Sequence, residues 1–143
     1  MKGEYRQPKS ATELYMLADA AYHGSPWSID VFKHDLANEH ASYLVLTIDD
    51  QPVGFVAGTL IIDELSISNV AVIPDYQRQN LGANMLQTWF KLFEQETRVL
   101  LEVRSQNIAA QHLYTKLGFQ VIATRQAYYQ HPVDDALIME KIL

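Results

Sequence analysis

The chain has 143 residues, no cysteine, 48% hydrophobic residues and 20% charged residues, a composition typical of one soluble globular domain. A domain of this length buries roughly 68–70% of the surface of its unfolded chain, so it needs no disulfide or metal for stability. The absence of cysteine excludes disulfide scaffolds, thiolate zinc sites and cysteine nucleophiles. The formal charge of −6 argues against binding to a nucleic-acid backbone. We therefore expect a single domain over residues 1–143, with no nucleic acid as partner.

The apolar segments are too short to predict a membrane span. The longest near-apolar run extends from Val53 to Ile62, well below the ~20 residues that cross a bilayer, and two glycines interrupt it. The first residues, Met1 to Arg6, lack the apolar core of a signal peptide. We therefore expect no membrane partner and a cytoplasmic location.

Apolar periodicity and turn residues predict alternating helices and strands. The predicted elements, in chain order, are a short extended start at Tyr5-Arg6, a helix capped by Ser10 or Thr12, a helix from Ser28 to about Asn38, strands over Tyr43–Ile48, Val53–Ile62 and Leu65–Val72, a helix from Gly82 to about Glu96, a strand over Val99–Val103, a helix from about Asn107 to Leu117, and strands over Phe119–Thr124 and Ala136–Ile142. The order ααβββαβαββ after a short N-terminal strand predicts an α/β (α+β) fold. Its mixed, mostly antiparallel central sheet is flanked by helices.

A polar turn joins the strand that ends at Val72 to the helix that begins near Gly82. Asn80 tolerates positive φ, and such a turn can aim successive backbone N–H groups at one point, where the helix dipole strengthens an anion site. Arg78 would add a positive charge. An ordinary strand-to-helix connection explains this local pattern about equally well, because a lone glycine-containing loop is a weak signal.

Asn107 and Tyr114 lie seven residues apart, so on a helix they share one face, with Ala110 and Gln111 between them. An amide and a phenol separated by small residues leave room for a ligand. Taken alone, however, Tyr114 is better explained as a half-buried tyrosine with its hydroxyl in water. Glu102, on the preceding strand, either faces solvent or lines a cleft, and taken alone its position favours solvent.

Other reactive residue types show no catalytic or metal-binding pattern. The five histidines lack metal-ligand spacing, so no metal is predicted. A G-x-S-x-G nucleophile motif is absent, which disfavours a covalent hydrolase. Trp89, Phe90 and Phe93 lie at helical spacing and are predicted to pack in the core.

Together these segments resemble the GNAT superfamily of acetyl-CoA-dependent N-acetyltransferases over almost the whole chain. The segment Gln77-Arg78-Gln79-Asn80-Leu81-Gly82-Ala83 is similar to the family's Q/R-x-x-G-x-G/A motif, with Asn80 in place of the first glycine. The resemblance implies the GNAT fold and acetyl-CoA as co-substrate. It implies that the motif holds the CoA pyrophosphate through backbone N–H groups, and that Asn107 and Tyr114 complete the CoA site. It also implies that backbone amides of the strand from Asn69 to Val72, with Val70, Ala71 and Val72 as the cofactor-binding residues, pair with the pantetheine arm and polarise the thioester carbonyl.

Within that superfamily, three segments resemble the RimI-like protein N-terminal acetyltransferases. His23 to Ser28 is similar to H-x-x-P-W-S, Glu102 to Phe119 to E-V-R-x-x-N-x-x-A-x-x-L-Y-x-x-x-G-F, and Tyr128 to Ala136 to Y-Y-x-x-P-x-x-D-A. Two positions depart from the family pattern: Ser66 stands where a Glu is common, and Gln126-Ala127 replaces a basic-Asn pair.

The resemblance implies direct transfer of acetyl to an amine, with Glu102 as base and Tyr114 as acid. It also implies that two parallel strands splay apart to admit the pantetheine. The Pro26-Trp27 turn and a loop carrying Tyr128 and Tyr129 would flank the acceptor. For this subfamily the acceptor is the N-terminal alanine of a small-subunit ribosomal protein, so a protein or peptide N-terminus is expected. A lysine side chain, a small-molecule amine, and a non-catalytic CoA-binding module remain alternatives, and the sequence leaves open whether the protein is a monomer or a dimer.

Overall fold

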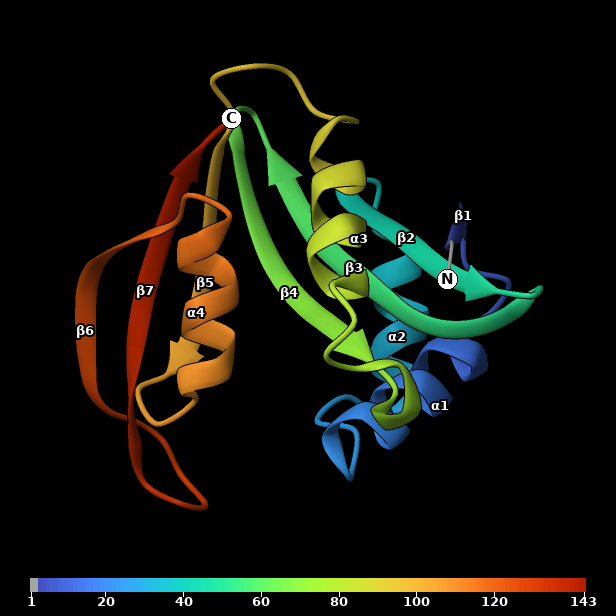
Figure 1. Ribbon diagram of the computed structural model, residues 1–143, viewed down its shortest axis with the longest axis horizontal. Coiled ribbons are helices and arrows are strands. Elements are labelled where there is room, and N and C mark those ends of the chain that lie inside the picture. The colour runs from blue at the N-terminus through green and yellow to red at the C-terminus, as the bar shows by residue number, and fades with distance from the viewer. Residues whose placement is uncertain (1–2) are drawn as a thin grey trace.

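The computed structural model describes residues 3–143, and in this range seven strands form one sheet with helices on both faces (Figure 1). The strand order is β1-β2-β3-β4-β5-β7-β6, with β4 and β5 parallel and the other neighbouring pairs antiparallel. The elements are β1 (Glu4–Arg6), α1 (Ala11–Tyr22), α2 (Ile29–Leu36), β2 (Ala41–Ile48), β3 (Gln51–Ile61), β4 (Glu64–Val72), the 3₁₀ turn η1 (Pro74–Tyr76), α3 (Leu81–Phe90), β5 (Arg98–Arg104), α4 (Ile108–Lys116), β6 (Gln120–Tyr129) and β7 (Asp134–Ile142). The mixed, mostly antiparallel sheet predicted from the sequence is confirmed.

Side-chain caps fix the starts of the first two helices. Ser10 Oγ accepts the Glu13 N–H at 3.1 Å, so α1 begins at Ala11 and Thr12 lies inside it. Ser28 Oγ accepts the Val31 N–H at 3.2 Å and starts α2 in the same way. The sequence left the first cap open between two residues, and the structure assigns it to Ser10.

Helix α3 is shorter than its apolar pattern predicts. It ends at Phe90 instead of continuing to about Glu96, and Leu92 is 62% exposed. The Glu96 N–H donates to the carbonyl of Leu143 at 2.7 Å, and Glu96 has φ 71°. The chain must leave the helix to reach this contact and enter β5, so tertiary pairing overrides the local helical period.

Strand β6 is longer than predicted. It runs to Tyr129, beyond the predicted end at Thr124, because its pairing with β7 resumes at Tyr129 and Asp134 after an irregularity. Within that irregularity Ala127 has φ 50°, and its N–H donates to Asp135 Oδ1 at 2.8 Å. The prediction that Tyr128 and Tyr129 lie in a loop is therefore wrong, since both belong to the end of a strand.

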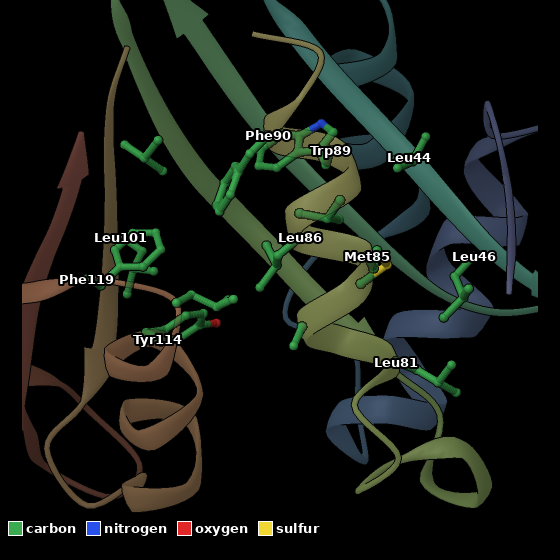
Figure 2. Close-up of a cluster of buried hydrophobic side chains, with 14 of the residues drawn as sticks. Leu44, Leu46, Leu81, Met85, Leu86, Trp89, Phe90, Leu101, Tyr114 and Phe119 are labelled. Atoms are coloured by element: carbon green, nitrogen blue, oxygen red, sulfur yellow. The ribbon is translucent and has the colours of Figure 1, made fainter. Parts of the chain in front are cut away.

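The two faces of the sheet bury separate cores. One core contains α3, Tyr114 and Leu117 at the end of α4, and Phe119, and the other is formed under α1 and α2. Trp89 and Phe90 are buried in the first, as predicted, and Figure 2 shows both among its side chains. Phe93 is partly buried against the same core, with its ring centroid 5.1 Å from that of Trp89.

Strands β4 and β5 separate along their length. Their parallel pairing covers Glu64 to Ser66 of β4 and ends there, and Figure 1 shows the two strands diverging from the end marked by the C-terminus. A bulge between Ala57 and Gly58 of β3 shifts the register with β4 just beyond this point. The sheet therefore has an opening between β4 and β5. Helices α1 and α2 lie on one face of this sheet, and α3 and α4 lie on the other. Within residues 3–143 no helix is long and apolar enough to cross a membrane.

Candidate active site

Two adjoining cavities occupy the opening between β4 and β5. The larger, of about 870 Å³, extends to the loop before α3 and to α4, and the smaller, of about 580 Å³, extends to β6. Five residues line both cavities: Ile67, Ser68, Leu101, Glu102 and Tyr129. The two spaces therefore meet where β4 and β5 part.

Glu102 lies at this junction on the α1/α2 face of the sheet. Its neighbours Leu101 and Val103 point the other way, into the core below α3 and α4, so alternation along β5 turns Glu102 to the opposite face. Its side chain is 38% exposed, and the nearest cation is Arg125 Nη1, 4.0 Å from Oε1. The carboxylate is exposed and also lines both cavities, so the two alternatives left by the sequence are met together.

Tyr114 reaches the opening from the other face. The residue is 9% exposed on α4, and Figure 2 shows its hydroxyl directed towards the space between α4 and α3. Burial, reinforced by the nearby phenols of Tyr22 and Tyr129, raises the pKa of Tyr114 well above its usual range. Burial therefore keeps this phenol protonated to higher pH than an exposed tyrosine.

The edge of β4 that faces the opening is covered by two side chains. Tyr22 Oη donates to the carbonyl of Val70 at 2.8 Å and accepts the Val70 N–H at 3.2 Å. Gln77 Nε2 donates to the carbonyl of Val72 at 2.7 Å. Ala71 alternates with these residues, so its backbone groups point at β3 and its side chain is buried. Val70 and Val72 line the larger cavity, whereas Ala71 does not.

The loop before α3 provides a helix N-terminus without a side-chain cap. Arg78 and Asn80 have φ of 63° and 62°, and no side chain caps the first turn of α3. A Cβ added at Gly82 would meet only Val72 Cγ2, at 3.9 Å, so the backbone there can be approached closely. Uncapped N–H groups at a helix N-terminus favour an anion.

Most residues predicted for this loop line the larger cavity. They are Gln77, Arg78, Asn80, Leu81 and Gly82. Gln79 and Ala83 do not line it. Gln79 Nε2 donates to the Asp75 carbonyl at 3.3 Å, and Ala83 packs in the core.

Asn107 caps α4 instead of lying within it. Its Oδ1 accepts the Ala110 N–H at 3.1 Å. Asn107 and Tyr114 nevertheless line the same cavity, as their seven-residue spacing predicts. The β5–α4 loop that carries Asn107 is held to β7 by Asp134, which accepts hydrogen bonds from Ser105 Oγ and, at 3.2 Å, from the Gln106 N–H.

The predicted acceptor residues divide between the cavities. Trp27 and Tyr128 line the smaller cavity, Pro26 lines the larger, and Tyr129 lines both. The rings of Tyr128 and Tyr129 lie 5.2 Å apart, edge to face, and the Arg104 guanidinium lies 4.3 Å from the centre of the Tyr129 ring. These contacts hold the end of β6 beside the junction of the cavities.

Three side chains of this site were not predicted. Tyr22 was only the end of a helix in the sequence, and its partner, the backbone of Val70, has no sequence signal. For Asn69 only the backbone was predicted to take part: its side chain is buried beside the opening, and the bulge that turns it there is invisible in the alternating pattern of its strand. Arg125 belongs to the part of β6 that lies beyond its predicted end.

Within residues 3–143 the structure contains no group of three or more side chains that could bind a metal ion. The expectation that no metal takes part stays a prediction.

Comparisons with known proteins agree with this fold. Residues 9–119 match the model of the acetyltransferase (GNAT) family. The chain is 38% identical over 125 residues to the ribosomal protein bS18-alanine N-acetyltransferase of Salmonella typhimurium, covering 82% of this chain and 81% of that protein. It is 35% identical over 121 residues to the protein of that name from Escherichia coli K12, covering 82% and 81%. The crystal structure of the ribosomal-protein-S18-alanine N-acetyltransferase from Escherichia coli superposes with a TM-score of 0.86 at 30% identity, over 99% of this chain and 94% of that one.

Proposed function

Because this chain belongs to the GNAT acetyltransferase family, we propose that it transfers the acetyl group of acetyl-CoA to the N-terminal α-amine of a protein, by direct attack of the amine on the thioester. One observation carries this proposal: an accessible carboxylate, Glu102, and a phenol, Tyr114, line one cavity from opposite faces of the sheet. A base on one side and an acid on the other suit the transfer of an acyl group between them.

The larger cavity fits acetyl-CoA as the donor. The uncapped first turn of α3, the left-handed Asn80 and the open space at Gly82 suit the pyrophosphate. The edge of β4 offers the Val70 and Val72 backbone groups to the amide-bearing pantetheine arm once Tyr22 and Gln77 release them. The Val70 N–H is then free to polarise the thioester carbonyl.

The chemistry requires two proton transfers. As the amine nitrogen bonds to the thioester carbon, Glu102 accepts a proton from the amine, directly or through a water molecule. As the carbon–sulfur bond breaks, Tyr114 donates its proton to the departing thiolate. Solvent then takes the proton from Glu102 and returns one to Tyr114. The cleft between β4 and β5 contributes most by holding the amine and thioester at attack distance.

The smaller cavity is the entrance for the acceptor. Trp27 and the Tyr128-Tyr129 pair form its walls beside Glu102. The α-ammonium group has a pKa near ~8 against ~10.4 for lysine, so at neutral pH a larger fraction of it is the neutral amine that attacks the thioester. Relatives named for the alanine of ribosomal protein bS18 support a protein N-terminus, and a ribosomal protein in the cytoplasm, as the partner.

Mass spectrometry of acetylated peptides tests the proposal. Peptides beginning with Ala or Ser and continuing with basic residues are expected to be acetylated at the free N-terminus, and Glu102→Gln to lower the rate, most strongly at the acidic end of the pH range. The same peptides with blocked N-termini and a free lysine are the matched control. Equal rates on the free and the blocked peptides would contradict N-terminal acetylation and support acetylation of lysine or of a small-molecule amine. Donor binding without any product would indicate a non-catalytic CoA-binding module.

A further inference from the structure

Asn69 carries a buried polar group without a partner in the described part of the chain. The residue is 4% exposed, and its Nδ2 group makes no hydrogen bond. The great majority of buried polar atoms are paired, and an unpaired buried donor destabilises the fold. Asn69 lines the larger cavity beside Tyr22 and Pro26, so its side chain borders the space that a ligand would fill.

The bulge between β3 and β4 determines the face on which Asn69 lies. Leu65 and Ile67 belong to the core below α3, as do Val70 and Val72 further along β4. The alternation therefore shifts by one residue between Ile67 and Val70, which places Asn69 on the α1/α2 face. Without the bulge Asn69 would point towards α3.

Glu102 lies on that same face, on the other side of the opening. Its strand turns Leu101 and Val103 to the opposite core, and both Glu102 and Asn69 line the larger cavity. The loop before α3 and Tyr114 approach from the α3/α4 side. Asn69 lines the larger cavity together with Glu102 and Pro26, and not the smaller one, so it borders the place where an acceptor that passes Glu102 would meet the donor.

A carboxamide matches the polar group nearest to a protein α-amine. It offers an NH₂ group as hydrogen-bond donor and a carbonyl oxygen as acceptor, and it carries no charge. In a peptide the first carbonyl is attached to the carbon that bears the reacting amine. In lysine, four methylene groups separate the amine from the backbone, and a simple alkylamine has no such carbonyl.

We propose that the Asn69 carboxamide hydrogen-bonds the first peptide group of the acceptor and thereby makes the site selective for an amine with a carbonyl on its adjacent carbon. This inference rests on the proposed N-terminal acceptor and names the residue that recognises it. A site built to hydrogen-bond a substrate discriminates strongly against an analogue that lacks the group, because its own buried polar atoms then stay unpaired.

A cycle of two acceptors and two enzyme forms tests the proposal. One acceptor is a peptide that begins with alanine, and the other has its first peptide bond replaced by a trans carbon–carbon double bond. The parent enzyme is expected to favour the peptide in kcat/KM. Asn69→Leu, which keeps the size of the side chain, is expected to reduce this preference by about 10- to 100-fold. The difference in amine pKa between the acceptors cancels in the ratio.

Three controls separate this role from a structural one. The dissociation constant for acetyl-CoA is expected to stay unchanged in Asn69→Leu, and the melting temperature to stay equal or rise, because an unpaired donor is removed. Asn69→Asp, which keeps the shape and loses the N–H donor, provides a second test if the leucine variant does not fold. Gln87→Leu removes an exposed carboxamide from α3 and is expected to leave the preference unchanged.

An unchanged preference in the Asn69 variants overturns the inference while leaving N-terminal acetylation in place. Equal loss on both acceptors, or weaker acetyl-CoA binding, overturns it in favour of a packing or donor-binding role. If the parent enzyme acetylates N-terminally blocked lysine peptides as fast as free N-termini, the proposed function itself fails.

Discussion

At the scale of single residues, Tyr114 and Glu102 differ in what their surroundings allow. Tyr114 is enclosed by the core below α4 and meets the cavity through its hydroxyl, whereas Glu102 stands on a strand with more than a third of its side chain exposed. Enclosure keeps a phenol protonated and oriented. Exposure keeps a carboxylate able to exchange protons with water. The two environments suit an acid and a base, respectively.

The change Tyr114→Phe tests the acid. Phenylalanine keeps the packing and removes the proton, so turnover is expected to fall by roughly 100-fold while the KM for acetyl-CoA changes little. Unchanged turnover would exclude Tyr114 as the acid.

The raised pKa of Tyr114 makes a separate prediction about pH. An acid works only while protonated, and burial moves the loss of its proton to higher pH. The kcat of the parent enzyme is therefore expected to show no alkaline decline from this group up to about pH 10, the pKa of an unperturbed tyrosine. Steady-state kinetics over pH 7–10 at saturating substrates check this. A decline below pH 9 that Tyr114→Phe abolishes would contradict the raised pKa.

At the scale of secondary-structure elements, the open edge of β4 is the most informative feature. An unpaired strand edge exposes backbone donors and acceptors that need partners. Here Tyr22, from α1, holds both backbone groups of Val70. The donor must displace this hydroxyl before it can pair with the strand.

The change Tyr22→Phe should therefore help the donor to bind. It removes the competing hydroxyl, and a hydrogen bond contributes about 0.5–1.5 kcal/mol net, so acetyl-CoA is expected to bind about 2- to 10-fold more tightly. Isothermal titration calorimetry measures the effect. Weaker binding would show instead that the Tyr22 hydroxyl contacts the bound donor.

The loop before α3 makes the second prediction at this scale. Asn80 has φ 62°, a conformation that a β-branched residue resists. Asn80→Val is expected to abolish most of the rise in melting temperature that acetyl-CoA causes. Asn80→Gly, the matched control, is expected to bind equally well or more tightly. If the valine variant keeps the full rise, this account of the loop is wrong.

The sequence predicts elements better than it predicts their irregularities. Ser28 and the apolar spacing of α1 act locally, so the helices and most strands could be located from the pattern alone. The bulge at Ala57 and Gly58, the early end of α3 and the continuation of β6 depend on partners distant in the chain. These irregularities shape the site: they place Asn69 and bring Arg125 and Tyr128 to the cavity.

At the scale of the whole molecule, charge bears on the choice of acceptor. The chain has 17 acidic and 11 basic residues, hence a formal charge of −6. Around the acceptor cavity, however, Arg125 and Arg104 supply local positive charge. The field of the whole protein attracts a basic peptide, and the local arginines oppose part of that attraction.

These two contributions differ in range, so salt separates them. The Debye length falls from ~30 Å at 0.01 M to ~3 Å at 1 M ionic strength, which removes long-range attraction first. Two peptides are compared that share an N-terminal Ala-Ser and continue with either lysines or glutamates. The lysine peptide is expected to have several-fold higher kcat/KM at 0.02 M salt, and the two values are expected to converge towards 1 M. A preference that persists unchanged at 1 M would show that contacts in the cavity, and not net charge, select the residues after the N-terminus. A preference for the glutamate peptide at low salt would show that Arg125 and Arg104 outweigh the acidic chain.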